Sequence, residues 1–168
     1  MSTPTPAESL TTAWQIHAAQ IDWTGKADAK ASFALALESG LLAGIVTLSS
    51  GKGALAQLFG WTIWPYRTGV LLIVLSALFA LAVVFPQLRR WHLKDEAKSG
   101  AYIYFGHARR HTALQQQRLI EQGTLIEEVS AQIVRMADIA WRKHNLLQAS
   151  LVCAVVGAGL VFSAGIWK

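Results

Sequence analysis

Ala27-Asp28-Ala29-Lys30-Ala31 leads directly into an apolar run, Ser32 to Leu48, and this junction decides the fold. The run can cross most of the hydrocarbon layer of a bilayer as a helix, because an α-helix rises about 1.5 Å per residue. Its one ionisable side chain is Glu38. At that rise Glu38 lies roughly 12 Å deeper than Lys30, too deep to reach water by extending. We therefore expect a membrane-spanning helix that carries a buried acid.

Two further runs are free of charged residues and long enough to cross about 30 Å of hydrocarbon, Thr68 to Phe85 and Leu146 to Trp167. The chain of 168 residues is 53% hydrophobic and only 15% charged, which is too apolar for a soluble domain of this size. We therefore expect an all-α integral membrane protein with three transmembrane helices and a small cytoplasmic helical domain.

Basic residues set the expected orientation, because Lys and Arg next to membrane spans stay on the cytoplasmic side. Residues 86–145 contain ten of them, whereas residues 49–67 contain two. The N-terminus is therefore expected in the cytoplasm. The expected order is a cytoplasmic N-terminal amphipathic helix at 1–30, transmembrane helix 1 at 31–48, an external loop at 49–67, transmembrane helix 2 at 68–85, a cytoplasmic helical domain at 86–145 and transmembrane helix 3 at 146–167.

An apolar stripe precedes the first span, since Leu10, Trp14, His17 and Ile21 recur at intervals of four, three and four residues. Two placements of this stripe are equally open. It lies on the lipid surface as an interfacial helix, or it docks on the cytoplasmic domain.

A further helix is expected to begin at Thr124, because Thr124-Leu-Ile-Glu127 has the spacing of a capping box. Apolar residues then recur at helical spacing, and no helix breaker intervenes before Leu146. The third span is therefore expected to be the second half of one long helix.

Small residues spaced four apart form one face of the first span, namely Ser32, Ala36, Gly40 and Gly44. Gly40 and Gly44 form the small-xxx-small pattern that lets two helix backbones approach closely in lipid. We expect this face to pack against another helix and to support a homo-oligomer.

Glu38 stands on the opposite side of the same helix. No Lys or Arg in any span can pair with it, so we expect it to be protonated or hydrogen-bonded to a polar group such as Ser76 or Gln148. Two roles are equally open. Glu38 gates an aqueous path by ionising when that path opens, or its hydrogen bond fixes the register of the helices.

The sequence shows no signature of an enzyme. There is no Gly-x-Ser-x-Gly elbow, no cytoplasmic Cys and no phosphate-binding Gly loop, and Cys153 lies within the last span. His107, His111 and Glu121 are the candidates for a metal site, but no zinc motif accompanies them, so surface histidines between arginines are the favoured interpretation. No catalytic residue and no metal site is expected.

The cytoplasmic segment contains, after an expected turn at Lys94–Gly100, the elements of a site for a small anionic ring ligand. Aromatic faces can stack on a base and cations can bind a phosphate. The candidate ligand-binding residues are Tyr104, Phe105, Arg109 and Arg110. The alternative is that the aromatic side chains form the core of a small helical domain, and the sequence alone favours that alternative.

Four motifs, in order and spacing, resemble the Pycsar effector transmembrane family (PycTM). They are Ala27–Ala31 at the start of the first span, Phe85-Pro86 at the end of the second, Tyr104–His107 in the inner segment and Arg142-Lys143 before the last span. The likeness covers roughly residues 10–167, and its charged motif residues are Asp28, Lys30 and Lys143.

The resemblance implies an effector of bacterial anti-phage defence in the inner membrane, with a periplasmic loop at 49–67 and a sensor domain at 86–145. In that family a partner cyclase makes cUMP or cCMP on infection, and the effector then impairs the membrane and causes abortive infection. The expected partners are this cyclic pyrimidine mononucleotide, the lipid bilayer and further copies of the chain; no cofactor and no nucleic acid are expected. The alternative function is a constitutive membrane subunit or holin-like permeabiliser without a nucleotide ligand.

Overall fold

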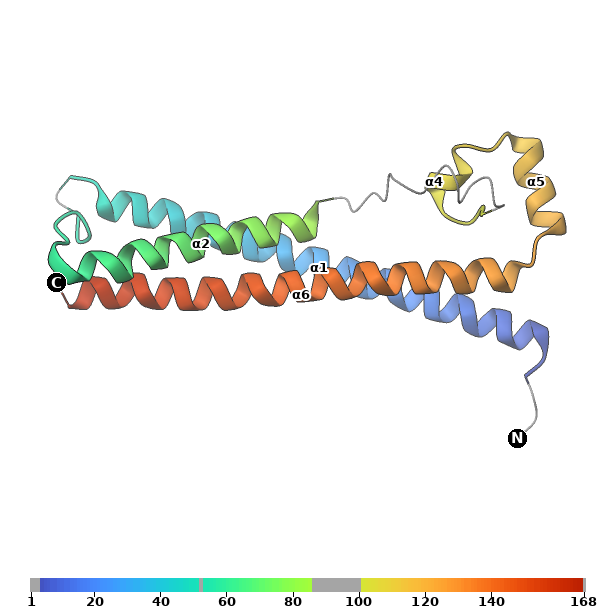
Figure 1. Cartoon of the computed structure of the whole chain (residues 1–168), viewed down its shortest axis with the longest axis horizontal. Coiled ribbons are helices and arrows are strands. Elements are labelled where there is room, and N and C mark those ends of the chain that lie inside the picture. Colours follow the sequence, from blue (N-terminus) through green and yellow to red (C-terminus); the bar gives the residue numbers. More distant parts are fainter. Residues whose placement is uncertain (1–3, 52, 86–100, 168) are drawn as a thin grey trace. The chain divides into compact units, whose positions relative to one another are not determined.

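The computed structural model describes residues 4–51, 53–85 and 101–167, of which 84% are helical and none lies in a strand. Three of the helices are long and apolar enough to cross a membrane, Pro6–Ser49, Gly60–Val84 and Leu125–Ile166, which confirms the predicted all-α fold class. The elements in chain order are α1 (Pro6–Ser49), η1 (Gly60–Thr62), α2 (Ile63–Val84), α4 (Phe105–Ala108), α5 (Ala113–Gln122) and α6 (Leu125–Ile166) (Figure 1).

The long helices extend beyond the apolar runs that predict them. α1 continues through Gly25 without a break, and α6 is the single long helix that the pattern after Thr124 predicts. α2 begins at Ile63 rather than at residue 68 and ends at Val84. Phe85 is extended, with φ −63° and ψ 132°, which is the conformation that a following proline favours. The expected turn at Lys94–Gly100 lies outside the described residues.

The chain divides into two compact units. One unit consists of Gly25–Pro86 and Arg142–Lys168, and the other consists of Met1–Thr24 and Gln87–Trp141. The first of these, here called the membrane unit, contains the apolar runs of all three spans. The second, here called the sensor unit after the role that the resemblance implies for residues 86–145, contains the N-terminal part of α1, the short helices α4 and α5, and the first part of α6.

Two apolar clusters hold the membrane unit together. One buries Ala31, Val83 and Leu147, with one residue from each long helix. The other buries Ile45, Leu55, Ile73 and Val161, so a residue of the loop between α1 and α2 joins the three helices. The same loop is fixed at its ends, because the Ser49 and Tyr66 hydroxyls lie 2.8 Å apart.

α2 and α6, which lie side by side in Figure 1, approach each other closely at two glycines. A Cβ atom at Gly69 would lie 2.6 Å from the carbonyl oxygen of Gly157, and one at Gly157 would lie 2.8 Å from that of Gly69. Any larger residue at either position would collide with backbone. The structure therefore uses a glycine pair that the sequence analysis did not single out.

In the sensor unit, α6 provides a buried face that includes Val129 and Gln132, and the N-terminal part of α1 buries Ala13 and Gln20. The predicted stripe does not coincide with this buried face, because Trp14 and Ile21 remain 39% and 52% exposed. The exposed stripe leaves both of its possible placements open.

Candidate functional site

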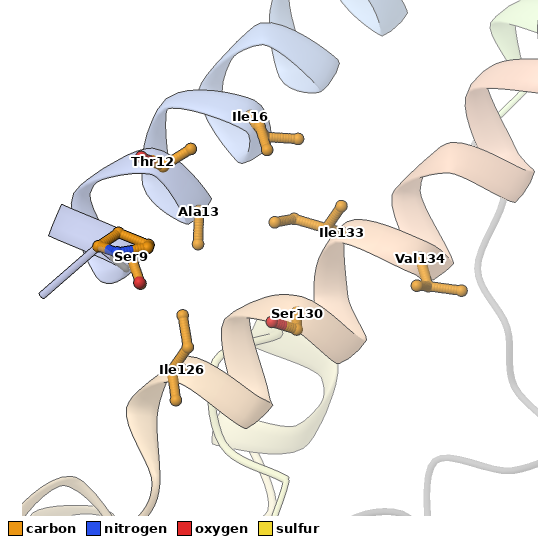
Figure 2. A pocket seen from close by; sticks show the side chains of 9 residues that line it. Ser9, Thr12, Ala13, Ile16, Ile126, Ser130, Ile133 and Val134 are labelled. Atoms are coloured by element: carbon orange, nitrogen blue, oxygen red, sulfur yellow. The ribbon is translucent and has the colours of Figure 1, made fainter. Parts of the chain in front are cut away.

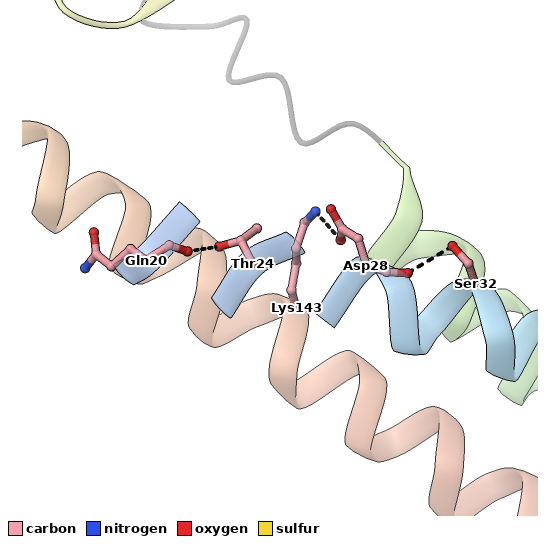
Figure 3. Close-up of polar contacts among 5 residues, drawn as sticks. All are labelled: Gln20, Thr24, Asp28, Ser32 and Lys143. Atoms are coloured by element: carbon pink, nitrogen blue, oxygen red, sulfur yellow. Dashed lines mark hydrogen bonds and ion pairs between the residues drawn. The ribbon is translucent and has the colours of Figure 1, made fainter. Parts of the chain in front are cut away.

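A half-buried ion pair in the membrane unit joins two of the motifs that carry the resemblance. The Lys143 ammonium on α6 donates to Asp28 Oδ1 on α1 over 2.5 Å, as Figure 3 shows. Lys143 is a buried residue, while the Asp28 side chain is 38% exposed. Small neighbours allow this contact, because Ala27 and Ala31 on the same turns of α1 are fully covered.

Two hydroxyl groups of α1 near the ion pair bond to the backbone of the same helix. Thr24 donates to the carbonyl of Gln20 over 2.8 Å, and Ser32 donates to the carbonyl of Asp28 over 2.9 Å (Figure 3). Lys30, the third charged residue of the motif, is exposed. Of the three motif charges, the structure therefore brings together Asp28 and Lys143 and leaves Lys30 on the surface.

Deeper in the membrane unit, Glu38 is 2% exposed and contacts a serine from each of the other two long helices. Its Oε1 bonds with the Ser76 hydroxyl of α2 and accepts from the Ser150 hydroxyl of α6 over 2.9 Å. The Ser76 oxygen also lies 2.7 Å from the Ser150 carbonyl oxygen. Ser76 is thus one of the two expected partners, whereas Gln148 is exposed and Ser150 takes its place.

The small-residue face of α1 lies away from this cluster. Ser32, Ala36, Gly40 and Gly44 are exposed, and a Cβ atom at Gly40 or Gly44 would meet nothing within 4 Å. Within the described part of the chain, this face packs against no other helix. Packing against a second copy stays a prediction.

The predicted ligand-binding residues lie in the sensor unit around α4. The rings of Tyr104 and Phe105 have centroids 4.4 Å apart, and Tyr104 also makes an edge contact with His107. Phe105 is 65% exposed, and Arg109 and Arg110 are exposed on the turn that follows. The structure thus places one aromatic face and two guanidinium groups on the surface of the same short segment.

The other side of this segment is buried in the core of the sensor unit. Tyr102 is buried, its ring lies against Gly123, and its carbonyl accepts from the Gln116 side chain over 3.2 Å. Burial raises the pKa of the Tyr102 phenol, and the charge of Glu128 raises it further; burial also raises the pKa of Tyr104. The aromatic cluster is therefore divided between a core ring, Tyr102, and an exposed ring, Phe105.

The two histidines of this segment contribute to its folded structure, one by a backbone contact and the other by burial. His111 Nε2 lies 3.1 Å from the carbonyl oxygen of Ala101, and His107 is 1% exposed. The prediction of two surface histidines is therefore wrong for His107, because the helical turn of α4 directs it into the core. Within residues 4–51, 53–85 and 101–167, no group of three His, Cys, Asp or Glu residues could hold a metal ion.

The sensor unit also contains a pocket of about 480 Å³ between α1 and α6. Figure 2 shows side chains of the two helices facing each other across it. Its lining is apolar apart from hydroxyl groups and contains no charged side chain. The lining residues are Pro4, Ser9, Thr12, Ala13, Ile16, Ile126, Ser130, Ile133 and Val134. A phosphate would find no cation there, so this pocket does not replace Arg109 and Arg110 as an anion site.

Comparison with known families gives a match that covers nearly the whole chain. The family model for the Pycsar effector protein domain matches residues 12–167. No curated protein and no solved structure matches the chain. The matched residues include both members of the ion pair and all three residues of the Glu38 cluster.

Proposed function

The chain belongs to the Pycsar effector protein family, and from this membership we propose that it is an anti-phage effector that binds cUMP or cCMP and then impairs the bacterial inner membrane. The observation that carries the second half of the proposal is the cluster of Glu38, Ser76 and Ser150, one polar residue from each spanning helix. An acid in hydrocarbon costs about 2.5–3.5 kcal/mol on insertion scales, so its presence favours a function within the membrane.

The nucleotide site in this proposal is formed by Tyr104, Phe105, Arg109 and Arg110. Phe105 supplies an exposed face for a pyrimidine base, and the two exposed arginines supply hydrogen-bond donors for a cyclic phosphate. The chain acts as a binding protein and not as an enzyme in this account, with the sensor unit in the cytoplasm.

α6 is the element that links nucleotide binding to the membrane. It is unbroken from Leu125 to Ile166 and carries both Lys143 and Ser150. A displacement of its first turns would therefore change the ion pair with Asp28 and the hydrogen bonds of Glu38. Separation of Glu38 from its serine partners would open a polar path, in which the ionised carboxylate stabilises the open state.

Several copies of the chain take part in the open state. The exposed face of Gly40 and Gly44 is the proposed contact between copies, because small residues let helices approach closely where lipid provides no other driving force. In that arrangement Glu38, on the opposite side of α1, faces the helices of its own copy.

The test is reconstitution of the full chain in vesicles of phosphatidylethanolamine and phosphatidylglycerol that hold a potassium gradient. We expect cUMP or cCMP to bind and to collapse the membrane potential, with cAMP as the inactive control. A constitutive permeabiliser would collapse the potential before any nucleotide is added. Retention of the potential with both pyrimidine nucleotides would contradict the proposal.

A further inference from the structure

Each of the three spanning helices places one buried polar side chain at the same point of the membrane unit. Glu38 is 2% exposed, and Ser76 and Ser150 are both completely covered. Four oxygen contacts define the cluster, and the 3.2 Å contact between the two hydroxyl oxygens is the longest of them. The three closer contacts are Ser76 with Glu38 Oε1, Ser150 Oγ with Glu38 Oε1 at 2.9 Å, and Ser76 Oγ with the Ser150 carbonyl at 2.7 Å. Glu38 Oε2 is buried and has no hydrogen-bond partner.

The three contacts need three protons, and the two serines provide two. Each hydroxyl has a single hydrogen, and a carboxylate and a carbonyl have none. If Glu38 were ionised, Ser76 could donate to Glu38 or to the Ser150 carbonyl but not to both, and two acceptor oxygens would face each other without a proton. A neutral Glu38 supplies the third proton: it donates to Ser76, Ser76 donates to the carbonyl, and Ser150 donates back to Glu38.

The Oε2 atom of Glu38, which is buried without a hydrogen-bond partner, also indicates that the carboxyl group is neutral. A buried carboxylate oxygen without a donor keeps a share of a full negative charge in an apolar surrounding, which costs far more than the same atom in a neutral acid. No charged hydrogen-bond donor offsets this cost, since Ser76 and Ser150 are the only partners of Glu38 in the part of the chain that the structure describes. The next titratable group on α6 is Cys153, about one turn beyond Ser150.

A metal ion does not fit in place of the proton. The Ser76, Ser150 and Glu38 oxygens already lie at hydrogen-bond distances from one another, with 3.2 Å between the two hydroxyl oxygens. Glu38 is the one acidic residue of the cluster, and the described residues contain no group of three His, Cys, Asp or Glu that could hold a metal ion, whereas a proton is accommodated by the observed contacts.

We propose that Glu38, Ser76 and Ser150 form an intramembrane proton-binding site, which holds its proton on Glu38 in the resting protein and releases it when the path opens. The release step rests on the proposed function, because it requires that nucleotide binding opens a path to water. The resting proton does not depend on that function.

The resting proton is measurable by infrared spectroscopy of the full chain in lipid vesicles at neutral pH without nucleotide. Carboxyl groups with ordinary pKa values are ionised under these conditions. We expect a protonated-carboxyl band in the wild type that shifts in heavy water and is lost in Glu38→Gln. The exposed carboxyl of Asp138 gives the matched control, because Asp138→Asn should leave the band in place.

Two further variants keep Glu38 and change its partners. Ser76→Ala and Ser150→Ala each remove one hydrogen bond of Glu38, so each should move the frequency of the band without removing it. Absence of the band from the wild type, or its persistence in Glu38→Gln, would overturn the proton assignment.

Addition of nucleotide then tests the release step. We expect cUMP or cCMP to weaken the band in proportion to the loss of membrane potential. An unchanged band in vesicles that do depolarise would overturn the release step. Failure to depolarise would instead count against the proposed function, while the resting band would still decide the proton site.

Discussion

Lys143 and Asp28 form an ion pair of 2.5 Å between α6 and α1, although 115 residues separate them in the sequence. Both belong to short motifs at the start of a span, and each motif alone gives no reason to expect the other. The pair explains why both charges occur at these positions, because a buried Lys143 without Asp28 would lose its counter-charge in a poorly hydrated place.

Asp28→Asn is expected to destabilise the protein, because it leaves the Lys143 charge buried without a partner. Breaking a fully buried pair costs about 3–5 kcal/mol and an exposed pair about 0–1 kcal/mol, so this half-buried pair should cost about 1–3 kcal/mol. Thermal unfolding in detergent measures the change. Lys30→Gln is the control, because Lys30 belongs to the same motif but is exposed; an equal loss in both variants would contradict the assignment.

Two pairs of glycines are expected to respond differently to enlargement. Gly69→Leu and Gly157→Leu force side chains into facing backbone and should lower the free energy of unfolding by about 1–3 kcal/mol or more. Gly40→Leu and Gly44→Leu meet open space within the chain, so they should weaken crosslinking between copies in membranes and leave unfolding unchanged.

Gly159→Leu is the control for the glycine series, because it is also an exposed helical glycine with nothing within 4 Å. Unchanged crosslinked bands in both α1 variants would show that the strip of Gly40 and Gly44 is not a contact between copies.

Phe105→Ala is expected to weaken nucleotide binding roughly tenfold or more, since stacking on an aromatic ring contributes about 1–3 kcal/mol per base. Arg109→Ala should weaken binding through loss of a phosphate contact. Both side chains are exposed, so unfolding should change little. Leu114→Ala, at an exposed apolar residue of α5, is the control. Full affinity for labelled cUMP and cCMP in both variants would place the site elsewhere.

Orientation is expected to follow the basic residues. Residues 86–145 contain ten Lys and Arg against two in residues 49–67, so a reporter fused after Lys168 should be periplasmic. Cytoplasmic activity of a reporter fused after Lys168 would contradict three spans with a cytoplasmic N-terminus.

The sequence predicts most of the secondary structure, because lipid burial leaves a strong mark on composition. Three apolar runs identify three helices, and the pattern after Thr124 identifies the length of α6. The helix starts carry readable signals as well. Thr112 and Gln115 form a capping box before α5, and Thr5 and Glu8 exchange the same bonds before α1.

Packing was harder to predict, because it depends on which faces meet. Gly69 and Gly157 lie on different helices, and neither has a small-residue repeat as regular as that of Gly40 and Gly44. The serine partner of Glu38 on α6 shows the same difficulty. Gln148 and Ser150 are two positions apart, about 200° around the helix, so only one of them can face α1. The arginines that follow His107 in the sequence favour a surface position for it. The turn of α4 instead buries His107 and leaves Arg109 and Arg110 exposed.

The most direct test of the central claim is membrane depolarisation after nucleotide addition in vesicles that contain wild type, Glu38→Gln or Glu38→Leu. The account predicts that the wild type depolarises with cUMP or cCMP but not with cAMP, and that both variants insert and bind nucleotide yet fail to depolarise. A Gln variant that behaves like the wild type, beside a Leu variant that fails, would reduce Glu38 to a hydrogen bond that fixes helix register. Normal depolarisation by Glu38→Leu would contradict any role of this residue in opening the membrane.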